Sequence, residues 1–381
     1  MNKKKESKVV PNVRFKGFTD DWKQRKLGDV GSVSMCRRIF KEQTSESGDI
    51  PFYKIGTFGG EADAFISREL FEEYKAKYPY PKKGDILISA SGSIGRTVEF
   101  TGENEYFQDS NIVWLNHDER LDNSFLKCFY SVVKWAGIEG STIKRLYNDN
   151  ILNTTITLPS VAEQKKIGEY FSIIDHLITL SQRKIDKLKN LKKSMLEKMF
   201  PKKGTVSPEI RFNGFTNDWE QRKLSDIVDV CSGRDYKHLS EGDIPVYGTG
   251  GYMLSVSEAL SYDKDAIGIG RKGTIDKPYI LNAPFWTVDT LFYAIPREKI
   301  DLNFTFDIFQ NIDWKKKDES TGVPSLSKTA INEINVLVPQ YDEQQALGEF
   351  FNGIDHLITL HQRKIDMLKK LKSACLSEMF I

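Results

Sequence analysis

The chain has 381 residues with 39% hydrophobic and 12% aromatic content, which is enough apolar material for two or more cores and excludes a disordered protein. Its formal net charge of +2 does not by itself indicate nucleic-acid binding, so any case for DNA must come from how the basic residues are arranged. No apolar run approaches the roughly 18 residues of a membrane-spanning helix, and the opening MNKKKESK lacks the apolar core of a signal peptide. We therefore expect a cytoplasmic protein with reduced cysteines.

A block near the start of the sequence returns later in the chain. RFKGFTDDWKQRKLGDV at 14–30 matches RFNGFTNDWEQRKLSDI at 211–227, at an offset of 197 and with 12 of 17 positions identical. A second pair of blocks, at 168–200 and 348–380, matches at an offset of 180 with 22 of 33 positions identical. The intervening segments 31–155 and 228–335 share only fragments, and the first half is longer by 197 − 180 = 17 residues. The chain is therefore a tandem repeat of a variable block followed by a fixed block.

The variable blocks predict α+β heads built from short strands. GDILISASGSIG at 84–95 and DAIGIGRKGTI at 265–275 are apolar or alternating runs interrupted by glycine. The stretch GIGRKG at 268–273 matches G-x-G-x-x-G, but a dinucleotide site needs a helix next. The TIDKPYILNAPFW that follows has two prolines and no helical period, so strand and turn glycines are the preferred interpretation.

The fixed blocks predict two long helices that pack against each other. Each carries a seam of residues at strict 4-3 spacing, with one polar residue at the fifth position and a lysine at the eighth. The first seam consists of Ile167, Phe171, Ile174, Ile178, Ser181, Ile185, Leu188, Lys192, Met195 and Met199. The second consists of Leu347, Phe351, Ile354, Ile358, His361, Ile365, Leu368, Lys372, Cys375 and Met379.

The starts of these helices are also predicted. In LPSVAEQ at 158–164, Ser160 is placed to cap the first turn while Glu163 reaches back to the cap, which forms a capping box. In VPQYDEQ at 338–344, Gln340 is a poorer cap, although Asp342 and Glu343 place negative charge where the helix dipole favours it.

The order of these blocks resembles the specificity subunit of type I DNA restriction-modification systems, over nearly the whole chain. The opening blocks match from Trp22 to Asp29 and from Trp219 to Asp226. The helix starts match at Leu158, Pro159, Glu163 and Gln164, and again at Val338, Pro339, Glu343 and Gln344. Family members often have a second proline where this chain has Ser160 and Gln340.

The resemblance implies a fold and a set of partners. The expected fold class is α+β, a pseudo-two-fold tandem repeat of two α/β target recognition domains separated by two long helices packed as an antiparallel coiled coil. The expected boundaries are 1–158 and 204–337 for the recognition domains and 159–203 and 338–381 for the helical regions. The implied partners are double-stranded DNA, two methyltransferase subunits and restriction subunits, with no membrane. The chain itself is implied to be a non-catalytic specificity subunit without cofactors, since S-adenosylmethionine belongs to the methyltransferase, and ATP and Mg to the restriction subunit.

The candidate DNA-binding residues are basic or hydroxyl side chains beside glycine-rich or serine-rich turns, which can approach a DNA backbone closely. Arginine can bond guanine through two hydrogen bonds, and serine hydroxyls can bond phosphate. The set is Arg37, Arg38, Lys54, Ser91, Ser93, Arg96, Lys144 and Arg145 in the first head, and Arg234, Tyr236, Lys237, Arg271 and Lys272 in the second. Trp114 is expected in the core.

Two other functions are compatible with parts of the sequence. An enzyme would need catalytic residues, and DKPY at 276–279 only approaches the D-P-P-Y of amino-methyltransferases because it lacks the proline that shapes their pocket. A coiled-coil scaffold with two protein-binding heads fits the helices as well as a specificity subunit does. DNA binding by the purified protein, alone or with methyltransferase subunits, separates the scaffold from the specificity subunit.

Overall fold

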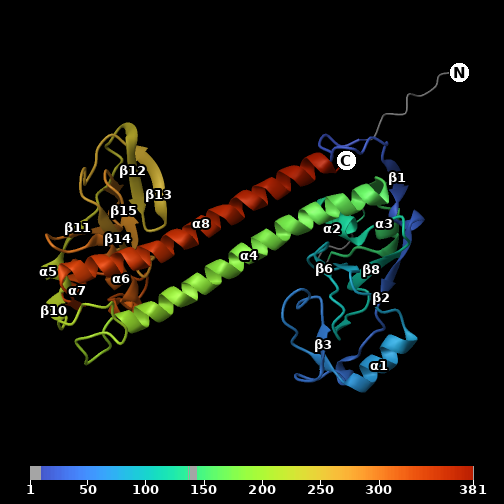
Figure 1. Ribbon diagram of the computed structural model, residues 1–381, viewed down its shortest axis with the longest axis horizontal. Helices are drawn as coiled ribbons and strands as arrows, with labels where there is room; N and C mark the ends of the chain where they lie inside the picture. Colours follow the sequence, from blue (N-terminus) through green and yellow to red (C-terminus); the bar gives the residue numbers. More distant parts are fainter. Residues whose placement is uncertain (1–9, 136, 138–143, 381) are drawn as a thin grey trace. The chain divides into compact units, whose positions relative to one another are not determined.

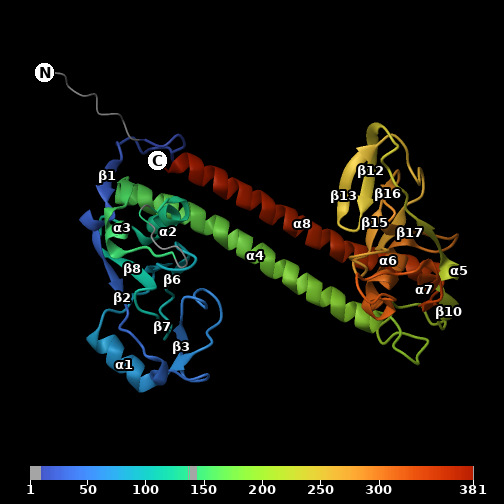
Figure 2. The same cartoon turned by 180° about the vertical axis from the view of Figure 1, so that it is seen from behind.

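The computed structural model describes residues 10–135, 137 and 144–380, which fold into two compact units (Figures 1 and 2). Unit 1 comprises Met1–Leu180 and Lys364–Ile381, and unit 2 comprises Ser181–Arg363. The long helices α4 (Val161–Met199) and α8 (Tyr341–Met379) each contribute one half to each unit. None of the helices in the described ranges combines the length and the apolarity that a membrane crossing needs.

Unit 1 contains a four-stranded sheet, a three-stranded sheet and a two-stranded ribbon, drawn in blue to teal in Figure 1. The strand orders are β2-β8-β5-β6, β4-β3-β7 and β1-β9. The strands are β1 (Lys23–Lys26), β2 (Gly31–Met35), β3 (Ile50–Tyr53), β4 (Phe65–Ile66), β5 (Ile86–Ser89), β6 (Thr97–Glu99), β7 (Tyr106–Phe107), β8 (Ile112–His117) and β9 (Thr155–Leu158). The helices of this head are α1 (Arg68–Lys77), α2 (Asn123–Val132) and α3 (Asn148–Asn153), with 3-10 turns η1 (Leu27–Asp29) and η2 (Lys41–Gln43).

Unit 2 repeats this topology in yellow to orange (Figure 2). Its strand orders are β11-β17-β14-β15, β13-β12-β16 and β10-β18. The strands are β10 (Glu220–Lys223), β11 (Val228–Ser232), β12 (Glu241–Gly248), β13 (Gly251–Val256), β14 (Ala266–Gly270), β15 (Tyr279–Leu281), β16 (Trp286–Thr287), β17 (Leu291–Pro296) and β18 (Asn335–Val338). The helices are α5 (Leu224–Ile227), α6 (Leu302–Asn311) and α7 (Lys328–Asn332), with the 3-10 turn η3 (Trp314–Lys317).

The extra length of the first head lies largely in one connection. Helix α1 is inserted between β4 and β5, whereas the corresponding link from β13 to β14 contains no helix among its residues, all of which the structure describes. These links have 19 residues (67–85) and 9 residues (257–265), so they account for 10 of the 17 extra residues. The connection after the glycine-containing strand β14 leads to strand β15 and not to the helix that a dinucleotide site needs, which agrees with strand and turn glycines in GIGRKG.

The repeated aromatic residues form the centre of each unit's core. Trp22 is 4% exposed and meets the ring of Phe125 edge-on, and Trp219 is 2% exposed and meets Phe304 in the same way. Trp114 is also buried, as expected. The two tryptophans of the opening blocks therefore attach each head to its own helix rather than contacting a ligand.

The seam prediction is confirmed in both units. In the half of α4 that belongs to unit 1, Tyr170 lies against Cys375 and Asp175 against Lys372, so the helices run antiparallel there. In unit 2 the corresponding ion pair joins Lys192 to Asp355. The polar seam residue Ser181 is 3% exposed, so it lies in the helix contact as its spacing predicted.

The capping box predicted for α4 is only half formed. The amide of Glu163 does donate to Ser160 Oγ, at 3.3 Å, so the cap itself is confirmed. The Glu163 side chain, however, accepts two hydrogen bonds from Arg14, from Nε at 2.6 Å and from an Nη nitrogen at 2.8 Å. A two-point bond to a guanidinium is stronger than a bond to a backbone amide, and it draws the carboxylate away from the cap.

A buried carboxylate in unit 2 marks where α6 meets the long helices. Asp307 is 1% exposed, and among the described residues no group hydrogen-bonds its Oδ2 atom. Burial raises its pKa well above the usual value; the nearby Lys192 opposes this rise, and Asp355 and Asp301 add to it. The corresponding residue of α2, six positions after the capping aspartate in both helices, is the neutral Cys128.

We expect Asp307→Asn to stabilise the protein at neutral and alkaline pH. Because its folded-state pKa is raised, the contribution of Asp307 to the free energy of unfolding is fully present at acid pH and is lost as pH rises from the unfolded pKa through the folded pKa. The variant has no such loss, so its free energy of unfolding should be higher by about 1–3 kcal/mol at pH 8 and nearly equal at acid pH. Denaturant titrations of both proteins from acid pH to pH 8 measure this difference in the free energy of unfolding. Asp263→Asn, an exposed change in the same unit, should leave the profile unaltered.

Candidate nucleic-acid interface

The first head has a crevice at one end of its four-stranded sheet, beside the start of α3. Its volume is about 340 Å³. The backbone there is fixed by Leu146, which is 3% exposed and whose N–H donates to the Ala90 carbonyl at 2.8 Å. We call this the first crevice; it is lined by Met35, Ala90, Ser110, Arg145, Leu146, Tyr147, Asn148 and Asp149.

The second head has a crevice of about 350 Å³ beside the start of α7. Leu326, which is 3% exposed, fixes its backbone through an N–H that donates to the Arg271 carbonyl at 2.9 Å. We call this the second crevice; it is lined by Ser232, Arg271, Lys272, Phe292, Glu319, Ser325, Leu326, Ser327 and Lys328.

The two crevices occupy corresponding places in the repeat. Ser91 forms an isolated bridge with Arg145, and Lys272 forms the corresponding bridge with Ser325. Met35 and Ser232 are the last residues of the corresponding strands β2 and β11. In the two heads, corresponding backbone segments therefore form the crevice, and different side chains line it.

The rims of the crevices carry polar groups suited to DNA. Arg145 supplies a cation to the first, and Arg271, Lys272 and Lys328 supply three to the second. Glu319 adds an acceptor to the second rim. Cations can bind phosphates or guanine, and carboxylates can accept from cytosine, so both crevices can contact a duplex.

The structure brings together only part of the predicted set in the first head. Arg145 lines the first crevice and Ser91 bridges to it, although the Ser91 hydroxyl is buried and bonded to Asn111. The other side chains lie outside its lining. Arg37 lies over the Tyr78 ring, Arg38 pairs with Asp109, Lys54 pairs with Asp63, Arg96 donates to the Phe58 carbonyl, and Ser93 and Lys144 are exposed.

In the second head the structure places Arg271 and Lys272 in the second crevice. Arg234, Tyr236 and Lys237 follow β11 outside the lining. Tyr236 is half-buried and packs against the cluster around Trp286, so much of its ring serves the core.

Two rim residues at the helix starts, Asn148 and Lys328, were missed in the sequence. They are related by an offset of 180, the offset of the fixed helical blocks, so the repeat register extends backward from those blocks into the heads. The shared Leu146 and Leu326 in RLYND and SLSKT were the available signal.

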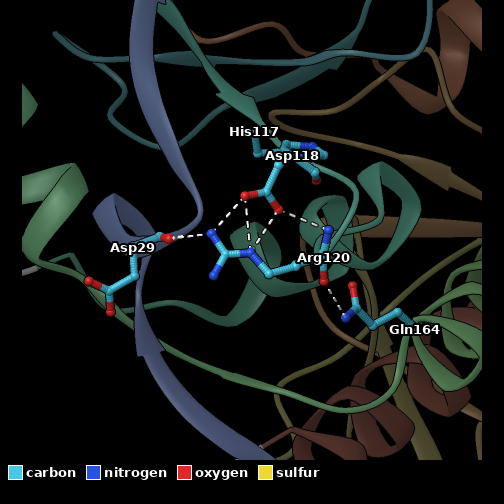
Figure 3. Close-up of polar contacts among 5 residues, drawn as sticks. All are labelled: Asp29, His117, Asp118, Arg120 and Gln164. Carbon is cyan, nitrogen blue, oxygen red and sulfur yellow. Dashed lines mark hydrogen bonds and ion pairs between the residues drawn. The ribbon is translucent and has the colours of Figure 1, made fainter.

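In each unit a glutamine near the start of the long helix, Gln164 or Gln344, hydrogen-bonds the backbone of the head. Figure 3 shows the corner at Arg120, whose side chain binds Asp118 and the Asp29 carbonyl while its own carbonyl accepts from Gln164. The hydrogen bonds from Arg120 lower the pKa of Asp118 to about 2. Gln164 Oε1 also accepts from the Asp122 amide at 2.8 Å.

The second head uses the same fastening. Gln344 accepts from the Asp301 amide at 3.0 Å and donates to the Pro339 carbonyl. The adjacent Glu343 accepts two hydrogen bonds from Arg211, both at 2.6 Å, as Glu163 does from Arg14. These bonds raise the pKa of both arginines. The repeated Glu-Gln pair thus joins the opening block, the head and the helix in each unit.

Comparison with known proteins places the chain in a family. The family described as "Type I restriction modification DNA specificity domain" matches residues 19–190 and 216–370, which is 172 + 155 = 327 of 381 residues. The chain therefore belongs to the type I restriction-modification DNA specificity family, which confirms the resemblance seen in the repeated blocks.

Individual relatives are consistent with this assignment. A putative type I restriction enzyme specificity subunit of Haemophilus influenzae is 63% identical over 156 residues, a match that spans 41% of this chain and only 40% of that protein. The MjaVIII specificity subunit of Methanocaldococcus jannaschii is 26% identical over 76% of this chain and 73% of its own length. The crystal structure of an S subunit from M. genitalium has the same fold, with a TM-score of 0.72 at 18% identity, covering 98% of this chain and 99% of that chain.

Proposed function

We propose that this chain selects a bipartite DNA target, with one half read by each head, and directs adenine methylation or restriction by partner subunits. The chain itself performs neither reaction in this proposal. Two methyltransferase subunits carry S-adenosylmethionine, and restriction subunits use ATP and Mg. The membership of the chain in the specificity family supports this role and does not favour a protein-binding scaffold.

One observation carries the proposal of two unlike half-sites. The heads share a topology and a crevice, yet the corresponding rim residues differ, with Asn148 in one head where Lys328 stands in the other. A single small domain reads few base pairs, so two linked readers multiply discrimination against non-specific sites. Of the predicted DNA-binding residues, Arg145, Arg271 and Lys272 line the crevices. The exposed residues among the others, from Arg37 to Lys237, are proposed to bind mainly phosphates beyond the crevices.

A genome-wide map of N6-methyladenine tests this function. In cells that express the chain with its methyltransferase partner, we expect one motif with two short defined parts, unlike each other, and a fixed gap. Cells with the methyltransferase alone are the control and should lack the motif. A continuous or palindromic motif would contradict the assignment of one half-site to each head.

A further inference from the structure

The two crevices carry different side chains at the residue that begins the short helix. Asn148 is the first residue of α3, and Lys328 is the first residue of α7. The residues before them, Tyr147 and Ser327, occupy the N-cap positions of these helices. The side chains of Asn148 and Lys328 therefore start from corresponding backbone positions, beside crevices of nearly equal volume.

Both side chains are available to a ligand. Asn148 and Lys328 are exposed, and neither side chain forms a hydrogen bond or ion pair within the ranges that the structure describes. Two residues earlier, Leu146 and Leu326 are buried and hold the backbone through the hydrogen bonds to Ala90 and Arg271. The position of each rim residue is thus fixed while its polar end is free.

The two side chains have different base chemistry. An asparagine amide holds an NH₂ donor group and a carbonyl acceptor in one plane, which matches N7 and the N6 amino group of adenine in the major groove. A lysine ammonium offers only donors, which match O6 and N7 of guanine. Glu319 lies on the same rim as Lys328 and can accept from the N4 amino group of the paired cytosine.

We propose that Asn148 and Lys328 are corresponding specificity-determining residues, so that Asn148 selects adenine in one half of the target and Lys328 selects guanine in the other. This inference rests on the proposed function, because it requires DNA at both crevices. In this proposal two positions select bases, and the surrounding arginines and lysines bind phosphates.

Reciprocal substitutions test the assignment. Asn148→Lys and Lys328→Asn are made separately in the full chain, expressed with its methyltransferase partner, and the N6-methyladenine motif is mapped. We expect Asn148→Lys to change one adenine to guanine in one half of the motif, and Lys328→Asn to change one guanine to adenine in the other half. Binding to duplexes carrying each of the four bases at the changed position should shift its preference by about 5- to 150-fold, the range for one good base contact.

Two matched substitutions control for charge. Asn104→Lys in the first head and Lys317→Asn in the second make the same chemical changes at exposed positions outside the crevices. Both should leave the motif unchanged.

Two outcomes would overturn the assignment. The first is a motif that neither reciprocal substitution alters. The second is a Lys328→Asn protein whose affinity falls equally for all sequences with a smaller salt dependence, since that identifies a phosphate contact. Absence of any bipartite motif for the unmodified chain would instead contradict the proposed function, so the two failures are distinguishable.

Discussion

Exchange of residues 27–154 for the corresponding block of another family member should change one half of the methylated motif and leave the other half intact. These cut points follow from the ribbon of β1 and β9, which pairs Lys26 with Thr155 and so brings the two junctions together. Because each mismatched base pair costs about 1–3 kcal/mol, a changed half-site should weaken binding to the original target by roughly 1000-fold or more. The N6-methyladenine map and binding to the original duplex measure both effects.

The exchanged block must keep its attachment to the helix. Phe125 packs in the core that contains the start of α4, and the amide of Asp122 binds Gln164, so the donor block should carry residues of the same type at these two places. Exchange of the corresponding block of unit 2, residues 224–334, is the matched experiment and should change the other half. If either exchange altered both halves, the heads would not be independent readers.

Glu163→Gln and Glu343→Gln should each destabilise the protein strongly. The carboxylates are 1% and 2% exposed as side chains, and each holds a guanidinium, of Arg14 or Arg211, at two points. Removing one member of a buried pair leaves the other charge uncompensated, at a cost of about 3–5 kcal/mol in the free energy of unfolding. Chemical denaturation of each variant measures this loss.

Glu220→Gln is the matched control for these variants, since Glu220 pairs with Arg222 at the surface and its side chain is 69% exposed. It should cost less than about 1 kcal/mol. Replacement of both Arg14 and Glu163 by leucine should cost less than the two single replacements summed, because no charge is left unpaired. Equal, small losses in all these variants would show that the pairs do not fasten the opening blocks.

The long helices and the tandem repeat could be predicted from the sequence. Residues such as Ile167 and Phe351 recur with a period that a helix alone satisfies, and both are buried. The sheets were predicted only as a class. The partner of β1 lies some 130 residues away in β9, and a local alternation of side chains contains no information about which strands pair.

The details that were missed depend on contacts between distant parts of the chain. Glu163 was expected to complete its own helix cap, but Arg14, 149 residues earlier, binds it instead. Likewise, the DNA-binding residues predicted from the sequence lie in runs of basic residues or beside glycine turns. Asn148 is not basic, and Lys328 is a single basic residue between Ser327 and Thr329, so only their place on the crevice rims distinguishes them from ordinary surface positions.

In each crevice a buried leucine fixes the backbone and an exposed residue two positions later faces outward. This division affects how such a protein can evolve. Leu146 and Leu326 are buried, so their loss would cost stability, whereas the exposed side chains of Asn148 and Lys328 form no hydrogen bond or ion pair among the described residues. Exposed substitutions usually change stability by less than about 0.5 kcal/mol. Selection for a minimum stability, which removes most core mutations, therefore tolerates mutations at these two positions. Under the proposed base contacts, single substitutions at these two positions would change the base that one head selects in a protein that still folds.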